Sequence, residues 1–345
     1  DFERGRRVIQ TNVIGVLNTF EPAIEIMKEQ GSGQIAALSS IAGTIGGLPG
    51  MAIYGASKSA VYTLCESLEI DLANFGIKVT CLAPGFIDTH FHFQTQIGYS
   101  LGLRDGLTSS MDLEMGCAGS YIDRWYKDRA GVTQANYGIA VSHEFARAMF
   151  IDGSDGADYL VNGPIAALTT RAKTGWSQTR PTLEQGNAIL QEIDKGLQAG
   201  AVGIGTTVGY MREGVSSREM FEVQKVGARY GRPTGAHTRY TLGNDTQENN
   251  GAQELIANAA ITGAHMHLCH INSTSLKDIL STLPMIESAK KRGVPVTVGA
   301  YPWGAASTVV GAAMFSGEGW PERMGSTAHS FQLGLDRMTE EQLAD

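Results

Sequence analysis

Apolar residues in the first quarter of the chain follow a pattern that predicts two helices and two strands. Residues 3–29 carry apolar side chains at three- and four-residue spacing, which is typical of a helix. After a glycine-rich break, Gln34–Ser40 is expected to form a short strand and Met51–Phe75 a long helix. A second buried strand is expected over Ile77–Ala83, and it ends at Pro84-Gly85.

Beyond Pro84 the pattern changes to short apolar runs that end in polar or metal-binding residues. Helical stretches separate several of them, at Thr182–Ala199, Ser217–Tyr230 and Ser275–Arg292. The expected strands are Gly85–His92, Thr108–Glu114, Gly138–His143, Val202–Thr207, Pro233–His237, His265–His270 and Pro295–Tyr301. Strands that alternate with helices in this way predict a (β/α)8 barrel lacking at least its last unit, with functional groups at the strand C-termini.

Composition and charge narrow the class of protein. The 345 residues are 42% hydrophobic and 18% charged, and the 43 glycines suit an α/β fold with many short connections. A net charge of -8 provides no basic surface, so we expect no nucleic-acid partner. No apolar run reaches the length of a membrane span, so we expect no membrane association. The four cysteines form no CxxC pair, which indicates free thiols and a cytoplasmic location.

The first group of candidate catalytic residues lies in the N-terminal part. Tyr54 and Lys58 are four residues apart, so they share one face of the predicted helix. A nearby ammonium lowers the pKa of a phenol, which lets the tyrosine exchange a proton with an alcohol or carbonyl. Ser40, at the end of a predicted strand, could hydrogen-bond the same substrate oxygen. The YxxxK spacing alone is weak, because a half-buried tyrosine beside a solvated lysine also satisfies it.

The order of several motifs gives this part a family resemblance. Asn12-Val-Ile-Gly15, Ser39-Ser40-Ile-Ala-Gly43, Tyr54 with Lys58, and Pro84-Gly85 follow one another. In that order they resemble the short-chain dehydrogenase/reductase family over residues 1–89. The resemblance implies a partial Rossmann-type fold, catalytic roles for Ser40, Tyr54 and Lys58, and a proton-relay role for Asn12.

The same resemblance implies NAD(P) as a cofactor. The residues that would contact it are Tyr54, Lys58, Pro84, Gly85, Ile87 and Thr89. The glycine-rich TGxxxGxG turn, with which the family binds the cofactor's pyrophosphate, does not precede Asn12. We therefore expect that this chain does not bind NAD(P).

The second group of candidate residues suggests a metal site. His90 and His92 are two residues apart, so on a strand they point to the same face and suit one divalent metal, commonly zinc. Two hydrogen-bonded or exposed histidines would give the same HxH motif, so alone it is a modest signal. His237 and His270 each follow a predicted strand, which strengthens it.

Residues 84–345, taken as an ordered set, resemble the amidohydrolase superfamily. Within it they resemble the N-acyl-D-amino-acid deacylase branch, which includes D-aminoacylase and N-acyl-D-glutamate deacylase. The metal ligands implied by the resemblance are His90, His92, His237 and His270. Glu114 is the candidate bridging ligand and Cys117 its rival, because D-aminoacylase uses a cysteine in this region. We favour Glu114, since a carboxylate can bridge two metals and Cys117 is expected to lie past the strand end.

Five further polar residues have less certain roles. Tyr210 and Arg239 are candidate contacts for a substrate carboxylate, and ordinary surface positions are the alternative. His143 is predicted to be a packed histidine rather than part of the site. His265 and His267 are predicted to share a face and to have a structural role.

The mechanism implied by the resemblance is metal-assisted hydrolysis of an amide bond in a small N-acyl amino acid. The metal lowers the pKa of a bound water, and a carboxylate then takes the proton of that water. The family's carboxylate ends its eighth strand. Asp336 and Asp345 lie in helix-like polar sequence and provide no convincing match. We therefore expect the general base to be missing and the activity to be impaired.

The two resemblances divide the chain at a short shared sequence. Residues 1–83 are expected to be a truncated dehydrogenase-like segment, and residues 84–345 a barrel lacking its C-terminal part. Pro84–His90 fits both patterns without a linker. Three functions remain open: a metal-dependent deacylase of N-acyl-D-amino acids, an NAD(P)-dependent oxidoreductase, and an inactive fusion of two gene fragments. We favour the fusion for the whole chain and the deacylase for most of its residues.

Overall fold

The computed structural model divides the chain into two compact units. Unit 1 comprises Asp1–Ile87 with Ser100–Ser109, and unit 2 comprises Asp88–Tyr99 with Ser110–Asp345. The boundary at Ile87 falls inside the predicted junction. The described residues are 2–45, 50–83, 85–92, 94–155, 157, 174–211, 213–239, 250–275, 278–301, 327, 330–333, 336–339 and 341.

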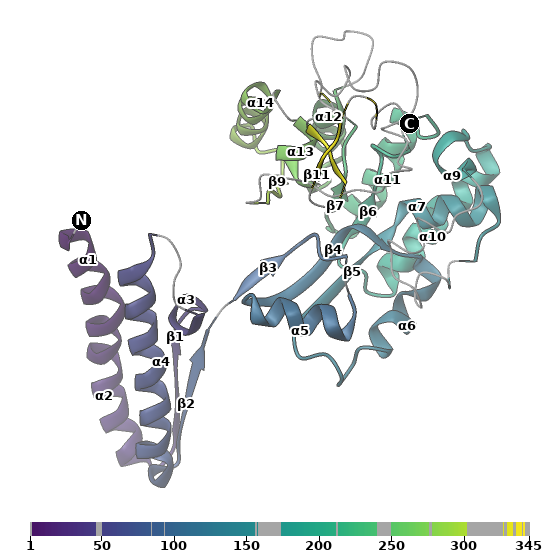
Figure 1. The fold of residues 1–345 in the computed structure, drawn as a ribbon. Coiled ribbons are helices and arrows are strands. Elements are labelled where there is room, and N and C mark those ends of the chain that lie inside the picture. The colour runs from purple at the N-terminus through teal and green to yellow at the C-terminus, as the bar shows by residue number, and fades with distance from the viewer. Residues whose placement is uncertain are drawn as a thin grey trace. The chain divides into compact units, whose positions relative to one another are not determined.

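Unit 1 contains two long helical segments and a two-stranded parallel sheet (Figure 1). The first segment runs without a break through α1, Phe2–Ile9, the π-helical turn η1, Gln10–Ile14, and α2, Gly15–Gln30. The remaining elements are β1 (Gly33–Leu38), α3 (Ala42–Ile45), α4 (Ala52–Leu72), the 3-10 turn η2 (Ala73–Phe75) and β2 (Ile77–Leu82). All four elements predicted from the apolar pattern are therefore present.

The burial of alternate strand residues organises the core of unit 1. Ile35 on β1 and Val79 on β2, which are paired in register, are both buried. Their buried neighbours come from α2 and α4 and include Phe20 and Val61. Gly76 precedes β2 at φ 69°, a left-handed conformation that favours glycine, so it can end the preceding helical turn.

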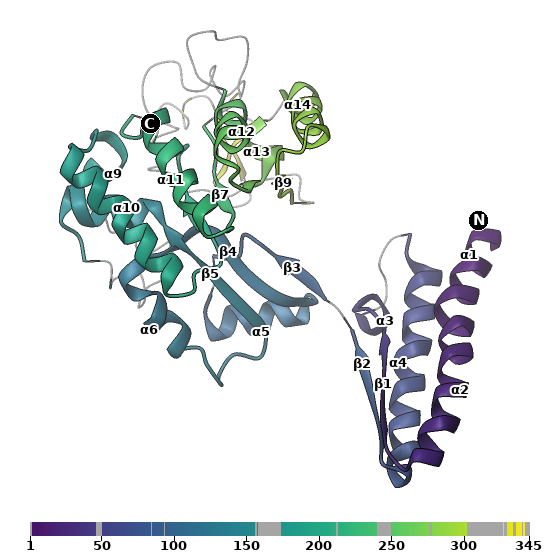
Figure 2. The ribbon, with the colours of Figure 1, turned by 180° about the vertical axis from the view of Figure 1, so that it is seen from behind.

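The fold of unit 2 is α/β and is built on a curled half-barrel sheet (Figure 2). Strands follow one another in chain order across it, and each pair from β5 to β9 is parallel. The seven strands are β3 (Phe86–Asp88), β4 (Leu107–Cys117), β5 (Asn136–Ser142), β6 (Ile204–Thr206), β7 (Thr234–Ala236), β8 (Met266–Leu268) and β9 (Val296–Val298). Each predicted strand of this region is present, and the predicted α/β fold class is confirmed.

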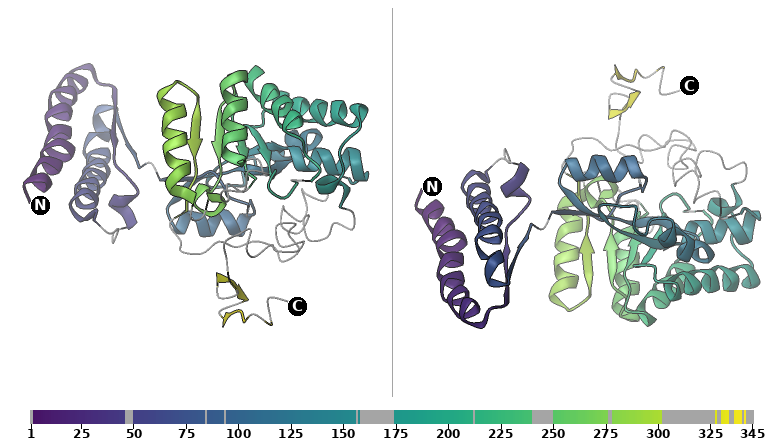
Figure 3. Two further views of the ribbon diagram at one scale, coloured as in Figure 1. Left: turned by 90° about the horizontal axis from the view of Figure 1, so that it is seen from above. Right: turned by 90° about the horizontal axis from the view of Figure 1, so that it is seen from below.

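Helices connect successive strands and pack on the sheet: α10 on β5, α12 on β8, and α14 on β9 (Figure 3). Their bounds are α5 (Gln96–Arg104), α6 (Ile122–Lys127), α7 (His143–Arg147), α9 (Gly175–Gln178), α10 (Leu183–Gln198), α11 (Ser217–Arg229), α12 (Gly251–Thr262), α13 (Ile271–Ser275) and α14 (Ile279–Lys291). Two short turns accompany them, η3 (Gly119–Tyr121) and η4 (Ala148–Asp152). None of the helices in the described part of the chain is long and apolar enough to cross a membrane.

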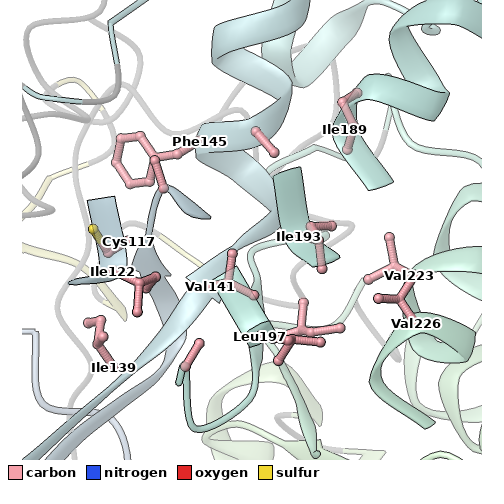
Figure 4. Packing of buried hydrophobic residues seen from close by; sticks show 14 of the residues in the cluster. Cys117, Ile122, Ile139, Val141, Phe145, Ile189, Ile193, Leu197, Val223 and Val226 are labelled. Carbon is pink, nitrogen blue, oxygen red and sulfur yellow. The ribbon is translucent and has the colours of Figure 1, made fainter. Parts of the chain in front are cut away.

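Side-chain caps and apolar spacing explain where α10 begins and how it packs. The Thr182 hydroxyl accepts a hydrogen bond from the Gln185 backbone N–H, and the Gln185 side-chain oxygen accepts one from the Thr182 backbone N–H. Ile189, Ile193 and Leu197 then repeat every four residues and are buried against β5 (Figure 4). Full burial of such a side chain stabilises a fold by roughly 1.5–3 kcal/mol.

A short antiparallel pair lies near the C-terminal end of the described residues. It consists of β10, Gln332–Leu333, and β11, Asp336–Arg337. Asp336 was predicted to lie in a helix-like stretch, and that prediction is wrong, because Asp336 lies on β11 and pairs with Leu333 of β10. Asp345 lies outside the described residues.

Candidate metal centre

Glu114 lies at the centre of the predicted metal site. It is on β4, its side chain is 3% exposed, and four imidazoles surround its carboxylate. The distances from Glu114 Oε2 are 2.5 Å to His90 Nε2, 3.3 Å to His270 Nε2 and 3.6 Å to His92 Nε2. His237 Nδ1 lies 3.0 Å from the other oxygen, Oε1. The structure thus brings together all five residues predicted to bind metal.

The parallel sheet explains why residues so far apart in sequence meet. His237 directly follows β7 and His270 lies two residues beyond β8, and these strands pair with Ala236 opposite Leu268. Parallel strands present their C-terminal ends at the same edge, so side chains that follow two neighbouring strands lie close together. The rings of His237 and His270 have their centroids 4.6 Å apart.

The donor set fits a divalent cation. Ligand atoms of His90, His92 and Glu114 lie within 4.8 Å of one another, and so do those of Glu114, His237 and His270. His90 Nε2 and His92 Nε2 are only 3.0 Å apart. Glu114 Oε2 is buried and makes no well-formed hydrogen bond to any described residue. Imidazole nitrogens and a carboxylate oxygen are the usual ligands of zinc, and a shared cation would satisfy all of these atoms.

Burial and mutual attraction set the protonation of these groups. Burial lowers the pKa of His90 to about 4 and also lowers that of His237, which favours the neutral, metal-binding form of both. Burial would raise the pKa of Glu114, but His90 and His270 outweigh it and hold that pKa well below its usual range. Glu114 is therefore a carboxylate at neutral pH, as a bridging ligand must be.

Asp112 also belongs to this centre, although it is not among the predicted metal-site residues. It is fully buried on β4, and its Oδ2 lies 3.0 Å from His92 Nδ1. Burial would lower the pKa of His92, but the Asp112 and Glu114 carboxylates together raise it well above its usual value. The signal that could have revealed Asp112 is its spacing, since Asp112 and Glu114 share one face of a strand.

Ser273 was also missed, and it fixes the ring of His270. The Ser273 hydroxyl lies 3.0 Å from His270 Nδ1 and donates to the His270 carbonyl at 3.0 Å. Because its one proton is used on the carbonyl, the hydroxyl must accept from Nδ1–H, which leaves the Nε2 lone pair directed at Glu114. His270 has φ 32°, an uncommon conformation for a residue other than glycine.

The expectation that Cys117 lies past the end of its strand is wrong. β4 continues through Met115, Gly116 and Cys117, and the Cys117 side chain is fully buried in an apolar cluster with Ile139 and Phe145. Burial raises the pKa of its thiol to about 12. A protonated thiol in an apolar cluster is a poor metal ligand, which favours Glu114 over Cys117 in this role.

The two candidate substrate contacts have different surroundings. The ring of Tyr210 lies against that of His237, with centroids 4.4 Å apart, so Tyr210 borders the metal centre. Arg239 donates from Nε to Glu254 at 2.9 Å and from Nη2 to the Val215 carbonyl at 2.5 Å. Arg239 is thus held in a largely buried ion pair.

Three further histidines have the structural roles that were predicted. His143 is fully buried, with Nδ1 2.9 Å from Thr206 Oγ1 and Nε2 2.9 Å from Glu219 Oε1. His265 and His267 both hydrogen-bond the Thr297 hydroxyl, at 3.2 and 2.9 Å, so they share one face of the sheet.

In unit 1 the predicted catalytic residues are near one another without forming a connected site. The Lys58 ammonium lies 5.8 Å from the centre of the Tyr54 ring and donates to the Leu38 carbonyl at 2.8 Å. The Ser40 hydroxyl accepts from the Ala42 N–H at 3.2 Å. Asn12 donates to the Ser57 hydroxyl at 3.0 Å. Among the described residues, no hydrogen bond joins Ser40, Tyr54 and Lys58 to one another.

The remaining predicted NAD(P) contacts are distributed over the two units. Gly85 donates its N–H to the Thr108 hydroxyl at 3.2 Å, and Ile87 is 63% exposed on β3. Thr89 belongs to unit 2, where its hydroxyl lies 3.4 Å from His267 Nε2. Pro84 lies outside the described residues.

Comparison with known proteins supports the assignment of the N-terminal segment. Residues 1–97 match the family model described as short chain dehydrogenase. An uncharacterized oxidoreductase of Myxococcus xanthus is 43% identical over 86 residues, which are 25% of this chain and 34% of that protein. One from Staphylococcus aureus is 40% identical over 82 residues, 24% of this chain and 35% of that protein. The predicted resemblance is confirmed, and the chain spans about a third of the length of these relatives.

Solved structures similar to this chain include two deacylases. N-acyl-D-glutamate deacylase from Bordetella bronchiseptica is 18% identical, with a TM-score of 0.47 over 67% of this chain and 51% of that chain. D-aminoacylase is also 18% identical, with a TM-score of 0.49 and the same coverage. The α/β fold and the half-barrel of unit 2 rest on the strand order described above.

Proposed function

We propose that unit 2 holds zinc between its four histidines and Glu114 and hydrolyses the amide bond of N-acyl-D-amino acids. The observation that carries the proposal is the convergence of four imidazoles on one buried carboxylate. The substrate class rests on the resemblance of residues 84–345 to N-acyl-D-amino-acid deacylases. A net charge of -8 gives the chain no general attraction for nucleic acid, which suits a small-molecule substrate.

The residues of the centre have separable roles in this reaction. When bound, the zinc would lower the pKa of a water and polarise the acyl carbonyl. Glu114 places a negative charge among the histidines, because its Oε2 faces His90 and its Oε1 faces His237. His90, His92, His237 and His270 would hold the cation together with Glu114. Tyr210, against His237, provides a hydroxyl for the carboxylate of the substrate.

The experiment compares metal content and hydrolysis in the whole chain. We expect the zinc-loaded protein to release the free amino acid from N-acetyl-D-amino acids at an impaired rate, because neither Asp336 nor Asp345 is a convincing general base in the sequence, and to leave the L-enantiomers intact. Glu114→Gln should abolish hydrolysis, because it removes the charge that binds the cation. Glu192→Gln is the matched control, since Glu192 is also buried and its side chain contacts Ser120 and Lys195 rather than any of the five candidate ligands. Zinc uptake without hydrolysis would contradict the enzymatic part of the proposal, and no uptake would contradict all of it.

Oxidoreduction with NAD(P) by unit 1 is a second candidate function. The match of residues 1–97 to the short-chain dehydrogenases favours it, as does the position of the Lys58 ammonium beside the Tyr54 ring. It is the weaker candidate, because Ser40 and Lys58 hydrogen-bond backbone groups rather than each other or Tyr54.

A further inference from the structure

The two oxygens of the buried Asp112 carboxylate have different partners. Oδ1 accepts hydrogen bonds from the backbone N–H groups of Glu114, at 3.1 Å, and of Met115, at 2.9 Å. Oδ2 faces His92 Nδ1 at 3.0 Å. Asp112 is fully buried. One carboxylate therefore contacts both a histidine of the metal centre and the backbone of its central glutamate.

The distribution of protons in this group follows from its geometry. Two amide N–H groups point at Oδ1, so that oxygen can only accept. Because an ionised carboxylate has no proton to give, the hydrogen bond to Oδ2 requires a proton on His92 Nδ1. In the neutral, metal-binding form of His92 the lone pair then lies on Nε2, which is the atom 3.0 Å from His90 Nε2 and 3.6 Å from Glu114 Oε2.

His90 provides an internal comparison. Its Nδ1 is buried and has no hydrogen-bond partner among the described residues, so nothing there sets its tautomer. Its position depends instead on the backbone, where the His90 N–H donates to Asp88 Oδ1 at 2.8 Å. Within the HxH pair, the structure thus fixes the ring of His92 and leaves the ring of His90 without such an anchor.

We propose that Asp112 is a positioning residue of the metal centre, which holds His92 in its metal-binding tautomer and aligns the backbone that carries Glu114. The inference rests on the proposed zinc site and adds a residue that does not itself bind the metal. A carboxylate that hydrogen-bonds a ligating histidine typically raises metal affinity by about 10- to 100-fold.

An isosteric substitution separates this role from a merely structural one. In Asp112→Asn the amide oxygen should remain at the Oδ1 position, where it accepts from Glu114 and Met115. The NH2 group would then replace Oδ2 and donate to His92 Nδ1. This would move the ring proton to Nε2 and block the nitrogen that faces the centre. A residue that only held the backbone of β4 would tolerate the change.

The test measures zinc affinity by titration of the whole chain against a chelator of known affinity. We expect Asp112→Asn to weaken zinc binding by about 10- to 100-fold, while the Glu192→Gln control stays within about twofold of the wild type. Circular dichroism of each metal-free variant checks that it is folded. Nitrogen NMR of the imidazoles in the zinc-loaded wild type should show a proton on His92 Nδ1 and none on Nε2.

Each negative result of these measurements would contradict a different part of the proposal. If the wild type binds no zinc, the proposed function itself is wrong. If the wild type binds zinc and Asp112→Asn binds it within about twofold, the positioning role is wrong and the metal centre stands. If Asp112→Asn does not fold, the wild-type NMR decides, and a proton on His92 Nε2 would overturn the inference.

Discussion

Unit 1 and unit 2 both contain parallel strands, but they bury them to different extents. The two-stranded sheet of unit 1 has helices on one face, and its other face leaves Leu38 61% and Leu82 49% exposed. In unit 2, the paired strands β5 to β8 are buried almost throughout, between helices and the interior of the half-barrel. Parallel sheets are normally covered on both faces, so unit 2 has the more usual arrangement.

The two candidate sites also differ in how far the surrounding sheet brings their side chains together. Both were predicted from short motifs. In unit 2 the sheet carries side chains from distant segments to one buried carboxylate. In unit 1 the corresponding side chains hydrogen-bond nearby backbone groups. A motif therefore forms a connected site only where the surrounding sheet brings its other members into contact.

The largest effect is expected from Glu219→Gln in unit 2. Glu219 Oε1 lies 2.5 Å from Arg147 Nη1 and 2.9 Å from His143 Nε2, and both partners are fully buried. The substitution leaves the Arg147 charge unpaired, which should lower the free energy of unfolding by roughly 3–5 kcal/mol at pH 7. Urea unfolding followed by tryptophan fluorescence measures this, because all four tryptophans lie in unit 2.

The pH dependence and a matched control sharpen this prediction. Burial would raise the pKa of Glu219, but His143 and Arg147 hold it below its usual value. The stabilisation is therefore fully present above the ordinary glutamate pKa of about 4.3 and is lost as pH falls through the lower, folded-state pKa. Glu222→Gln on the same helix breaks only a surface pair with Lys225 and should cost about 0–1 kcal/mol. Equal effects of the two substitutions would contradict the account.

A pair of leucine substitutions compares the two units directly. Leu197→Ala in unit 2 removes a side chain that is 5% exposed and should cost roughly 2–5 kcal/mol. Leu38→Ala acts on the exposed face of β1 and should change stability by about 0.5 kcal/mol or less. Hydrogen exchange of peptides from β1 and α10 measures both. If Leu38→Ala costs as much as Leu197→Ala, the outer face of unit 1 is covered in solution and the comparison fails.

The smallest effect is expected on the fluorescence of NADH and NADPH when the protein is added. The predicted NAD(P) contacts are spread over both units, and Lys58 donates to the Leu38 carbonyl. We therefore expect NADH and NADPH fluorescence to remain unchanged as the protein is titrated to high concentration. Saturable quenching that Lys58→Ala abolishes would instead establish a nucleotide site in unit 1.

Much of the fold could be predicted from the sequence, because each strand of unit 2 is an apolar run that ends in polar residues. The residue at which β4 ends could not be predicted in this way. Gly116 resembles a strand terminus, but at φ 71° it lets the chain pass the Ala140 carbonyl, which a side chain would meet at 2.4 Å. The strand therefore reaches Cys117 and buries it.

The candidate metal ligands could be predicted because histidines at strand ends are a local signal. The spacing of Asp112 and Glu114 places both on one face of a strand, but the roles of Asp112 and Ser273 could not be predicted, since they depend on which ring nitrogen each side chain faces. The sequence pattern predicts Arg147 to be a surface residue of a helix, but in the structure the carbonyls of Trp176 and Thr179 accept hydrogen bonds from its Nε and Nη2. Such burial depends on contacts between segments about thirty residues apart, and the sequence pattern does not record them.

The most direct test of the central claim is a zinc titration of the whole chain beside its Glu114→Gln variant. We expect saturable zinc binding by the wild type, with stabilisation of unit 2 in tryptophan-monitored unfolding and little change in the hydrogen exchange of unit 1. In Glu114→Gln both the binding and the stabilisation should be lost. Zinc uptake that is equal in the two proteins, or absent from both, would contradict the account.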